Sequence, residues 1–230
     1  MTTSAARPPE SRIFHRTTDR VPPRAIRGEG IWITGADGRR FLDACGGAAV
    51  SCLGHGDAEV IAALTAQAQT LAYAHTSFFT TDAAEDLAQH LVSGAPAGLA
   101  RVYFVCDGSE AIETAIKMAH QYHRERGATG RCHVIARQQS YHGNTLGALS
   151  AGGNATRRAV YEGLMLPLPS HVEPCWSYRY QRPVETAEAY GARAAAALEA
   201  EILRLGAGTV SCFVAETVVG ATAGCVPPAP

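Results

Sequence analysis

Apolar residues follow a helical period in several parts of the chain. Between residues 57 and 71 they recur every three or four positions, and this spacing predicts a helix that begins at Asp57. A second helix is expected from Asp82 to Leu91, where an aspartate again opens the pattern. The alanine-rich segment 187–205 predicts another helix, because alanine has the highest helix propensity.

Short apolar runs alternate with helical segments in the second half of the chain. The runs 101–106, 132–136 and 209–215 have the length and composition of buried strands. A helix is expected between the first two, from Glu110 to Arg126, and the alanine-rich helix precedes the third. This alternation predicts an α/β fold with a mostly parallel central sheet and helices on both faces.

The N-terminal part of the chain predicts a smaller α+β unit. Prolines interrupt every possible helix in residues 1–27, so an extended arm is expected there. Residues 30–34 and 40–43 are expected to form two strands of a hairpin, because the segment between them contains an Asp-Gly pair, which favours a tight turn.

Charge and hydropathy exclude several classes of function. Twenty basic and 21 acidic residues give a formal net charge of -1, so the chain lacks the basic excess that a nucleic-acid or anionic-membrane surface requires. We find neither an apolar run of signal-peptide length at the N-terminus nor a stretch of about 18 apolar residues elsewhere. The sequence therefore predicts a soluble, cytoplasmic protein that acts on small molecules.

Cysteine, histidine and lysine give little support for metal or amine chemistry. The seven cysteines include no Cys-x-x-Cys pair, and the nine histidines include no zinc-binding motif, so we expect no metal site. Lys117 is the only lysine among the 20 basic residues. It lies about two turns into the helix that is expected to begin near Ser109, and an ion-paired or solvated position is expected for it.

The segment Asp107-Gly-Ser-Glu110 connects a predicted strand to a predicted helix. Free backbone amides at the helix N-terminus, the helix dipole and the Ser109 hydroxyl could hold a phosphate, and Gly108 would allow a close approach. The alternative is an ordinary helix cap, because an aspartate or serine followed by glutamate is typical of helix starts. Taken alone, the segment favours the cap.

Two further candidates follow predicted strands at their carboxyl ends, where open α/β sheets place their ligands. Tyr141 and His142 follow the second strand, and the tyrosine could stack on a flat heterocycle or simply pack under a loop. Glu216 follows the third strand and could be an acid of the pocket or a polar residue at a strand end.

These segments occur in the order found in class III aminotransferases. Residues 101–119, RVYFVCDGSEAIETAIKMA, resemble the segment with which that family binds phosphate. Residues 28–43, followed by Leu53-Gly-His55, resemble its N-terminal hairpin. Residues 140–147, SYHGNTLG, resemble the loop that stacks on the cofactor, and residues 215–220, AETVVG, resemble a later strand of the pocket. The resemblance covers nearly the whole chain from about residue 20.

The resemblance implies a fold type I enzyme that uses pyridoxal 5'-phosphate and works as a homodimer with active sites at the subunit interface. By position, Gly108 and Ser109 would hold the phosphate, Tyr141 would stack on the pyridine ring, and His142 would line the same loop. Glu216 would belong to the floor of the pocket.

The resemblance also implies how the chain is organised. Residues 1–27 would be an N-terminal arm, residues 28–65 the N-terminal part of the small domain, and residues 66–230 the first half of the large cofactor-binding domain. The fold is expected to be incomplete, because the family's pyridinium-binding aspartate and its Schiff-base lysine would both lie beyond Pro230. No catalytic residue is therefore expected within this chain, and the chain alone is expected to be inactive.

Three positions depart from the family pattern. Asp107 replaces a small neutral residue and places a carboxylate beside the expected phosphate, which weakens that contact unless the side chain points away. Asn144 stands where acetylornithine- and GABA-type members carry arginine, which argues against their substrates. Thr217 replaces a proline that is frequent there, with no chemical consequence that we can argue.

The leading hypothesis is a transaminase that moves an amino group from an amine or amino acid to a 2-oxo acid. Other class III chemistry, such as a dialkylglycine decarboxylase or an aminomutase, is the nearest alternative. A truncated relic without enzymatic activity is another alternative. An unrelated nucleotide-binding protein is disfavoured, because the chain contains neither of the common glycine-rich phosphate motifs.

Overall fold

The computed structural model describes residues 11–222 and residue 224. The chain forms two compact units, Met1–His90 and Leu91–Pro230, which we call the N-terminal and C-terminal units. The assignment of an arm, a small domain and a large domain stays a prediction.

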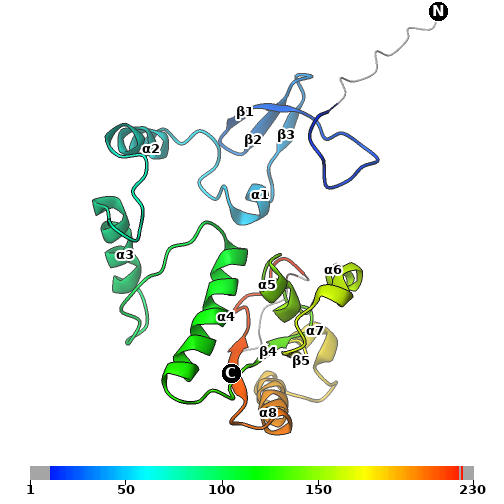
Figure 1. Cartoon of the computed structure of the whole chain (residues 1–230). Helices are drawn as coiled ribbons and strands as arrows, with labels where there is room; N and C mark the ends of the chain where they lie inside the picture. Colours follow the sequence, from blue (N-terminus) through cyan, green and yellow to red (C-terminus); the bar gives the residue numbers. More distant parts are fainter. Residues whose placement is uncertain (1–10, 223, 225–230) are drawn as a thin grey trace, which may run out of the picture. The chain divides into compact units, whose positions relative to one another are not determined.

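The N-terminal unit contains an antiparallel three-stranded sheet in the order β1-β2-β3 (Figure 1). The predicted hairpin is confirmed, and Gly38 takes the positive φ of 80° that its turn requires. The sequence analysis does not predict β1, which includes the last residues assigned to the arm. The strands are β1 (Ala25–Glu29), β2 (Trp32–Gly35) and β3 (Arg40–Leu42).

Both helices predicted near the N-terminus are confirmed. Asp57 caps the first of them, because its side chain accepts a hydrogen bond from the backbone N–H of Val60 at 3.0 Å. A short turn that the sequence does not predict, labelled α1, precedes this helix. Ala48 and Ala49 in α1 have positive φ angles of 63° and 65°. The helices are α1 (Gly46–Ala49), α2 (Ala58–Thr70) and α3 (Asp82–Ser93).

The C-terminal unit contains a parallel three-stranded sheet in the order β5-β4-β6. Two of its strands were expected and confirm the prediction of a parallel sheet. The sequence analysis does not predict β5, because its sequence Pro-Ser-His-Val is short and largely polar. The strands are β4 (His133–Arg137), β5 (Pro169–Val172) and β6 (Val210–Val214).

The two long helices of this unit match the predicted segments closely. The helix expected from Glu110 begins two residues earlier, at Gly108, and the alanine-rich helix has the expected bounds. Shorter helices lie between them in the sequence. The helices are α4 (Gly108–Glu125), α5 (Leu146–Ala151), α6 (Ala155–Arg158), η1 (Ala159–Leu164), α7 (Ser177–Tyr180) and α8 (Ala187–Leu205).

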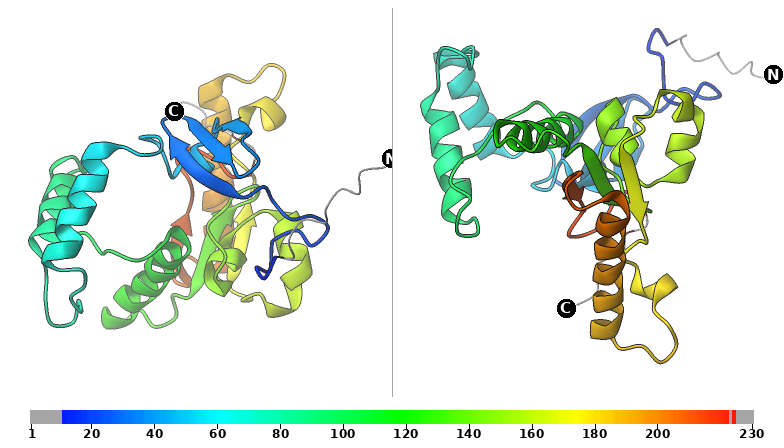
Figure 2. Two further views of the ribbon diagram at one scale, coloured as in Figure 1. Left: turned by 90° about the horizontal axis from the view of Figure 1, so that it is seen from above. Right: turned by 60° about the horizontal axis from the view of Figure 1, so that its bottom comes forward.

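Helices α4 and α8 lie on opposite faces of the sheet (Figure 2). Ile135 of β4 is fully buried in a cluster that Leu198 of α8 joins. The adjacent residue Val134 instead lines a cavity together with Ile116 of α4. Because successive side chains of a strand point to opposite faces, this places one helix on each side. The prediction of a layered α/β fold is confirmed.

The prediction of a buried strand at 101–106 is wrong. The segment has no strand conformation, and Tyr103 and Phe104 remain 71% and 47% exposed. The residues are suited to a strand, but a strand needs a partner for its backbone N–H and C=O groups. The described strands β5, β4 and β6 do not include one that pairs with this segment.

Apolar faces of the helices are open to a large extent. The predicted apolar face of α2 is exposed, with Ile61 at 52% and Leu64 at 66%, and α4 contains no buried residue. Among the described residues we find no helix that is both long and apolar enough to cross a bilayer. The buried apolar cluster of the sheet consists of Ile135, Val172 and Val210, and Leu198, Ile202 and Leu205 of α8 pack against it.

Candidate functional site

The loops after β4 and β6 meet at the carboxyl edge of the parallel sheet. The backbone N–H of Tyr141 donates a hydrogen bond of 3.3 Å to Oε2 of Glu216, which lies 75 residues further along the chain. The loop is anchored behind this contact by the buried Ser140, whose hydroxyl donates to the carbonyl of Arg137 at 2.6 Å. Two of the predicted site residues are thus brought together at the edge where α/β sheets bind ligands.

Helix α4 begins with a complete capping arrangement. The carboxylate of Asp107 accepts the backbone N–H of Glu110 at 3.0 Å, and the carboxylate of Glu110 accepts the N–H of Cys106 at 2.8 Å. Asp107 is therefore engaged in the cap, and the cap interpretation of this segment is confirmed. The amides of Gly108 and Ser109 are the first in the helix and have no intrahelical acceptor, so they stay available to an anion.

The start of α4 is in direct contact with the loop that contains Tyr141. The N–H of Asn144 donates to Oγ of Ser109 at 3.1 Å, which leaves the hydroxyl proton of Ser109 free to donate elsewhere. Gly143 has a φ of 132°, and a Cβ at this position would lie 2.7 Å from Cα of Ser109. Only glycine allows this close approach. The helix start that is expected to bind the phosphate thus lies next to the loop that is expected to stack on the pyridine ring.

A cation that the sequence analysis missed lies over Tyr141. The guanidinium carbon of Arg157 is 4.6 Å from the centroid of the tyrosine ring, which is a cation–π distance. Arg157 lies in the short helix α6, and its position in the sequence carries no motif that could have revealed it. The contact covers one face of the ring.

His142 is buried beside the same edge, with 5% of its surface exposed. Its Nε2 atom has no hydrogen-bond partner within the described residues. Burial lowers the pKa of His142, and the neighbouring His171 lowers it further, so the ring is neutral near pH 7. A neutral, buried imidazole nitrogen without a partner is the kind of group that a bound ligand satisfies.

Burial raises the pKa of Glu216 above its usual value. The backbone N–H of Tyr141 and the charge of Arg137 oppose this shift without cancelling it. A raised pKa means that the folded chain holds the proton more strongly than the unfolded chain. The contribution to stability is therefore greatest below the unfolded pKa of about 4.5 and is lost as pH rises through the folded pKa.

The replacement Glu216→Gln should reduce this dependence on pH. We expect the variant to lose less stability than the parent between pH 4.5 and pH 7, because glutamine cannot ionise. Urea unfolding at several pH values measures the difference. Glu199→Gln, on an exposed position of α8, is the matched control and should follow the parent. Parallel curves for the parent and Glu216→Gln would show that the carboxyl group has no raised pKa.

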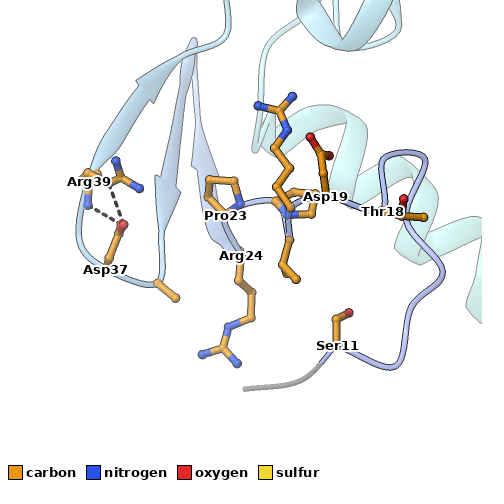
Figure 3. A pocket seen from close by; sticks show the side chains of 11 residues that line it. Ser11, Thr18, Asp19, Pro23, Arg24, Asp37 and Arg39 are labelled. Atoms are coloured by element: carbon orange, nitrogen blue, oxygen red, sulfur yellow. Dashed lines mark hydrogen bonds and ion pairs between the residues drawn. The ribbon is translucent and has the colours of Figure 1, made fainter. Parts of the chain in front are cut away.

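A cavity apart from this site contains none of the predicted site residues. It belongs to the N-terminal unit, has a volume of about 1000 Å³, and lies between residues 11–24 and the hairpin turn (Figure 3). Arg39 lines it, but its side chain is held by Asp37 at 2.6 Å. Hydrogen bonds from the backbone N–H of Arg39 and from its side chain lower the pKa of Asp37. The part of the chain that the structure describes has no cluster of side chains placed to hold a metal ion.

The fold and the site define an α/β protein with a capped helix N-terminus and an aromatic loop at the carboxyl edge of a parallel sheet. The sequence pattern of the family described as aminotransferase class-III matches residues 13–230. The chain therefore belongs to the class III aminotransferase family, as the resemblance implied.

Individual relatives agree with this assignment. An uncharacterized aminotransferase of Schizosaccharomyces pombe is 49% identical over 95% of this chain and 48% of its own length. An omega transaminase of Pseudomonas jessenii, solved in complex with PMP, has a TM-score of 0.85 and 31% identity over 90% of this chain and 46% of its own. A PMP-bound aminotransferase of Vibrio fluvialis has a TM-score of 0.84 and 34% identity, and the match covers 92% of this chain and 46% of its own length.

These comparisons confirm the expected fold type I architecture and its incompleteness. The chain spans about half the length of the relatives that it matches. It contains the part of the fold with the capped helix α4 and the loop of Tyr141.

Proposed function

We propose that the whole protein is a pyridoxal-phosphate-dependent aminotransferase, which moves an amino group from an amine or amino acid to a 2-oxo acid. One observation carries the proposal for this chain. The hydrogen bond between Asn144 and Ser109 joins a helix N-terminus suited to a phosphate with a loop that presents an aromatic ring and a buried imidazole. Pyridoxal phosphate combines an anionic group and a flat ring in one molecule.

The residues of this chain would bind and orient the cofactor. The amides of Gly108 and Ser109 and the Ser109 hydroxyl would hold the phosphate at the start of α4. Tyr141 would stack on the pyridine ring with the face opposite Arg157. His142 would contribute its unpartnered nitrogen to the same pocket, and Glu216 would keep the loop in place through the N–H of Tyr141.

The cofactor, when bound, supplies the electron sink that transamination needs. The contribution of this chain is to fix the position of the cofactor, because none of its described site residues is a lysine. The covalent lysine and the acid that pairs with the pyridine nitrogen would come from the remaining length of the protein. The site residues named above are binding residues in this proposal, and none of them is catalytic.

The proposal extends to the substrate, the assembly and the compartment of the protein. Asn144 replaces an expected arginine and favours substrates other than those of acetylornithine- and GABA-type enzymes. A homodimer would fit the open apolar faces of α2 and α4. We place it in the cytoplasm, as the sequence analysis expects. The arm 1–27, the small-domain part 28–65 and the large-domain part 66–230 are proposed as the organisation within that dimer.

The test is a transamination assay on the full-length product of the gene that encodes this chain. A panel of amines and amino acids is supplied with pyruvate or 2-oxoglutarate, with and without added pyridoxal phosphate. We expect amino transfer that depends on the cofactor. The isolated 230-residue chain is the control and should transfer no amino group.

Other outcomes separate the alternatives. Release of carbon dioxide from a dialkylglycine would identify the decarboxylating chemistry, and migration of an amino group within one substrate would identify an aminomutase. If the gene ends at Pro230 and its product binds the cofactor without turnover, the chain is a relic of an enzyme. A full-length product that does not bind pyridoxal phosphate would overturn the proposal.

A further inference from the structure

Helix α4 contacts the loop from Tyr141 to Thr145, which we call the cofactor loop, through a second side chain besides Ser109. Glu113 lies one helical turn after Ser109 and therefore on the same face of α4. Its Oε2 atom accepts a hydrogen bond of 2.6 Å from the hydroxyl of Thr145 and one of 3.2 Å from the N–H of Ala148. Ser109 accepts the N–H of Asn144 at 3.1 Å. Two side chains on one face of α4 thus bind adjacent residues of the loop.

The surroundings leave little freedom for the carboxylate of Glu113. Gly147 is buried, and a Cβ at this position would lie 2.5 Å from Oε2 and 2.8 Å from Oε1 of Glu113. Thr145 also caps α5, but its oxygen is 3.4 Å from the N–H of Ala148, which is longer than the 3.2 Å to Glu113. The carboxylate is thus the nearer acceptor where the loop continues into α5.

We propose that Glu113 is a positioning residue for the cofactor, which acts through Thr145 without touching the cofactor itself. This inference rests on the proposed function. Ser109 and Glu113 together fix the loop from Tyr141 to Thr145 against the start of α4. The separation between the phosphate-binding amides and the ring of Tyr141 is then set before the cofactor binds, and the cofactor need not order the loop.

A positioning role differs from a purely structural role in a measurable way. If Glu113 acts through Thr145, removing either partner should weaken cofactor binding to a similar extent, and removing both should cost no more than removing one. If Glu113 had a purely structural role, its substitution would lower the stability of the fold, and the effects of the two substitutions on cofactor affinity would not be coupled. Glu113→Gln is the conservative variant, because its amide oxygen can still accept the hydroxyl proton of Thr145.

The experiment measures the affinity of the full-length gene product for pyridoxamine 5'-phosphate by isothermal titration calorimetry. This probe carries an amine in place of the aldehyde and cannot form a bond to a lysine, so its affinity reports the non-covalent contacts alone. The variants are Glu113→Ala, Glu113→Gln, Thr145→Val and the double variant Glu113→Ala/Thr145→Val. Glu125→Ala is the matched control, because it removes a glutamate from the other end of the same helix.

We expect Glu113→Ala and Thr145→Val each to weaken binding about tenfold, the order of one charge-assisted hydrogen bond. The double variant should bind like Glu113→Ala, and Glu113→Gln should recover most of the affinity. Glu125→Ala should bind like the parent. Thermal unfolding of every variant checks that the proteins are folded. If Glu113→Ala does not fold, Thr145→Val, which is the milder change, still tests the same hydrogen bond.

Two results would overturn the inference while the proposed function stands. One is parent-like affinity in both Glu113→Ala and Thr145→Val, and the other is strictly additive losses in the double variant. If the unsubstituted protein does not bind the probe, the proposed function itself fails and the inference fails with it.

Discussion

Gly143→Ala is expected to destabilise the C-terminal unit by about 2 to 5 kcal/mol and to abolish measurable cofactor binding. The backbone of Gly143 has a φ of 132°, which a residue with a side chain rarely adopts. The added Cβ would also lie 2.7 Å from Cα of Ser109, so the loop and the start of α4 must separate. The separation breaks the hydrogen bond between Asn144 and Ser109 that joins the two ends of the site.

Urea unfolding and calorimetric titration with pyridoxamine 5'-phosphate measure the two effects of Gly143→Ala. Gly163→Ala is the matched control, because a Cβ there meets open space and its φ is not in the left-handed region. It should change stability by less than about 0.5 kcal/mol. If Gly143→Ala unfolds like Gly163→Ala, the loop does not approach α4 as closely as the structure indicates.

Sequence reasoning located the elements whose signals are local. Asp57 and Asp107 each cap the helix that follows them, and the Asp-Gly turn at Gly38 forms the hairpin. Each of these depends on a few neighbouring residues, so the pattern alone is enough to predict it. The positions of Tyr141 and Glu216 were predictable for a different reason. Each follows a predicted strand, and parallel strands place their carboxyl ends at one edge of the sheet.

Elements that depend on distant partners were predicted less well. The segment 101–106 has the composition of a strand, yet it does not form one, since strand formation needs a second strand to bond with. The opposite error concerns β5, which the polar residues Ser170 and His171 conceal, but which pairs with β4 in the sheet. In both cases the outcome depends on contacts across the sheet that local composition does not encode.

The site shows the same division. Taken alone, the segment 107–110 favoured a helix cap over a phosphate site, and only the order of four motifs implied the phosphate site. Arg157 could not have been found, because its contact with Tyr141 arises from the path of the chain after α5. Glu113 could have been found, since it lies four residues after Ser109 and so on the same face of the helix as that predicted site residue.

Lys117 is expected not to form the covalent bond with pyridoxal phosphate. It lies eight residues after Ser109, which is about 12 Å along the axis of α4. Glu113 and Gly147 lie with it around a separate, mainly apolar cavity of about 320 Å³. Glu113 is also bound to Thr145 and stands one turn closer to the cofactor loop. The amine of Lys117 would have to pass this contact to reach a ligand held by Ser109.

The measurement is borohydride reduction of the full-length gene product loaded with pyridoxal phosphate, followed by mass analysis of its peptides. We expect the label on a lysine outside residues 1–230 and none on the peptide that contains Lys117. Lys117→Arg keeps the positive charge but cannot form the bond. Because the covalent lysine is expected elsewhere, this variant should be labelled like the parent. Loss of the label in Lys117→Arg would identify Lys117 as the covalent site. Retention would place the amine that completes this site in the half of the fold that the chain does not span.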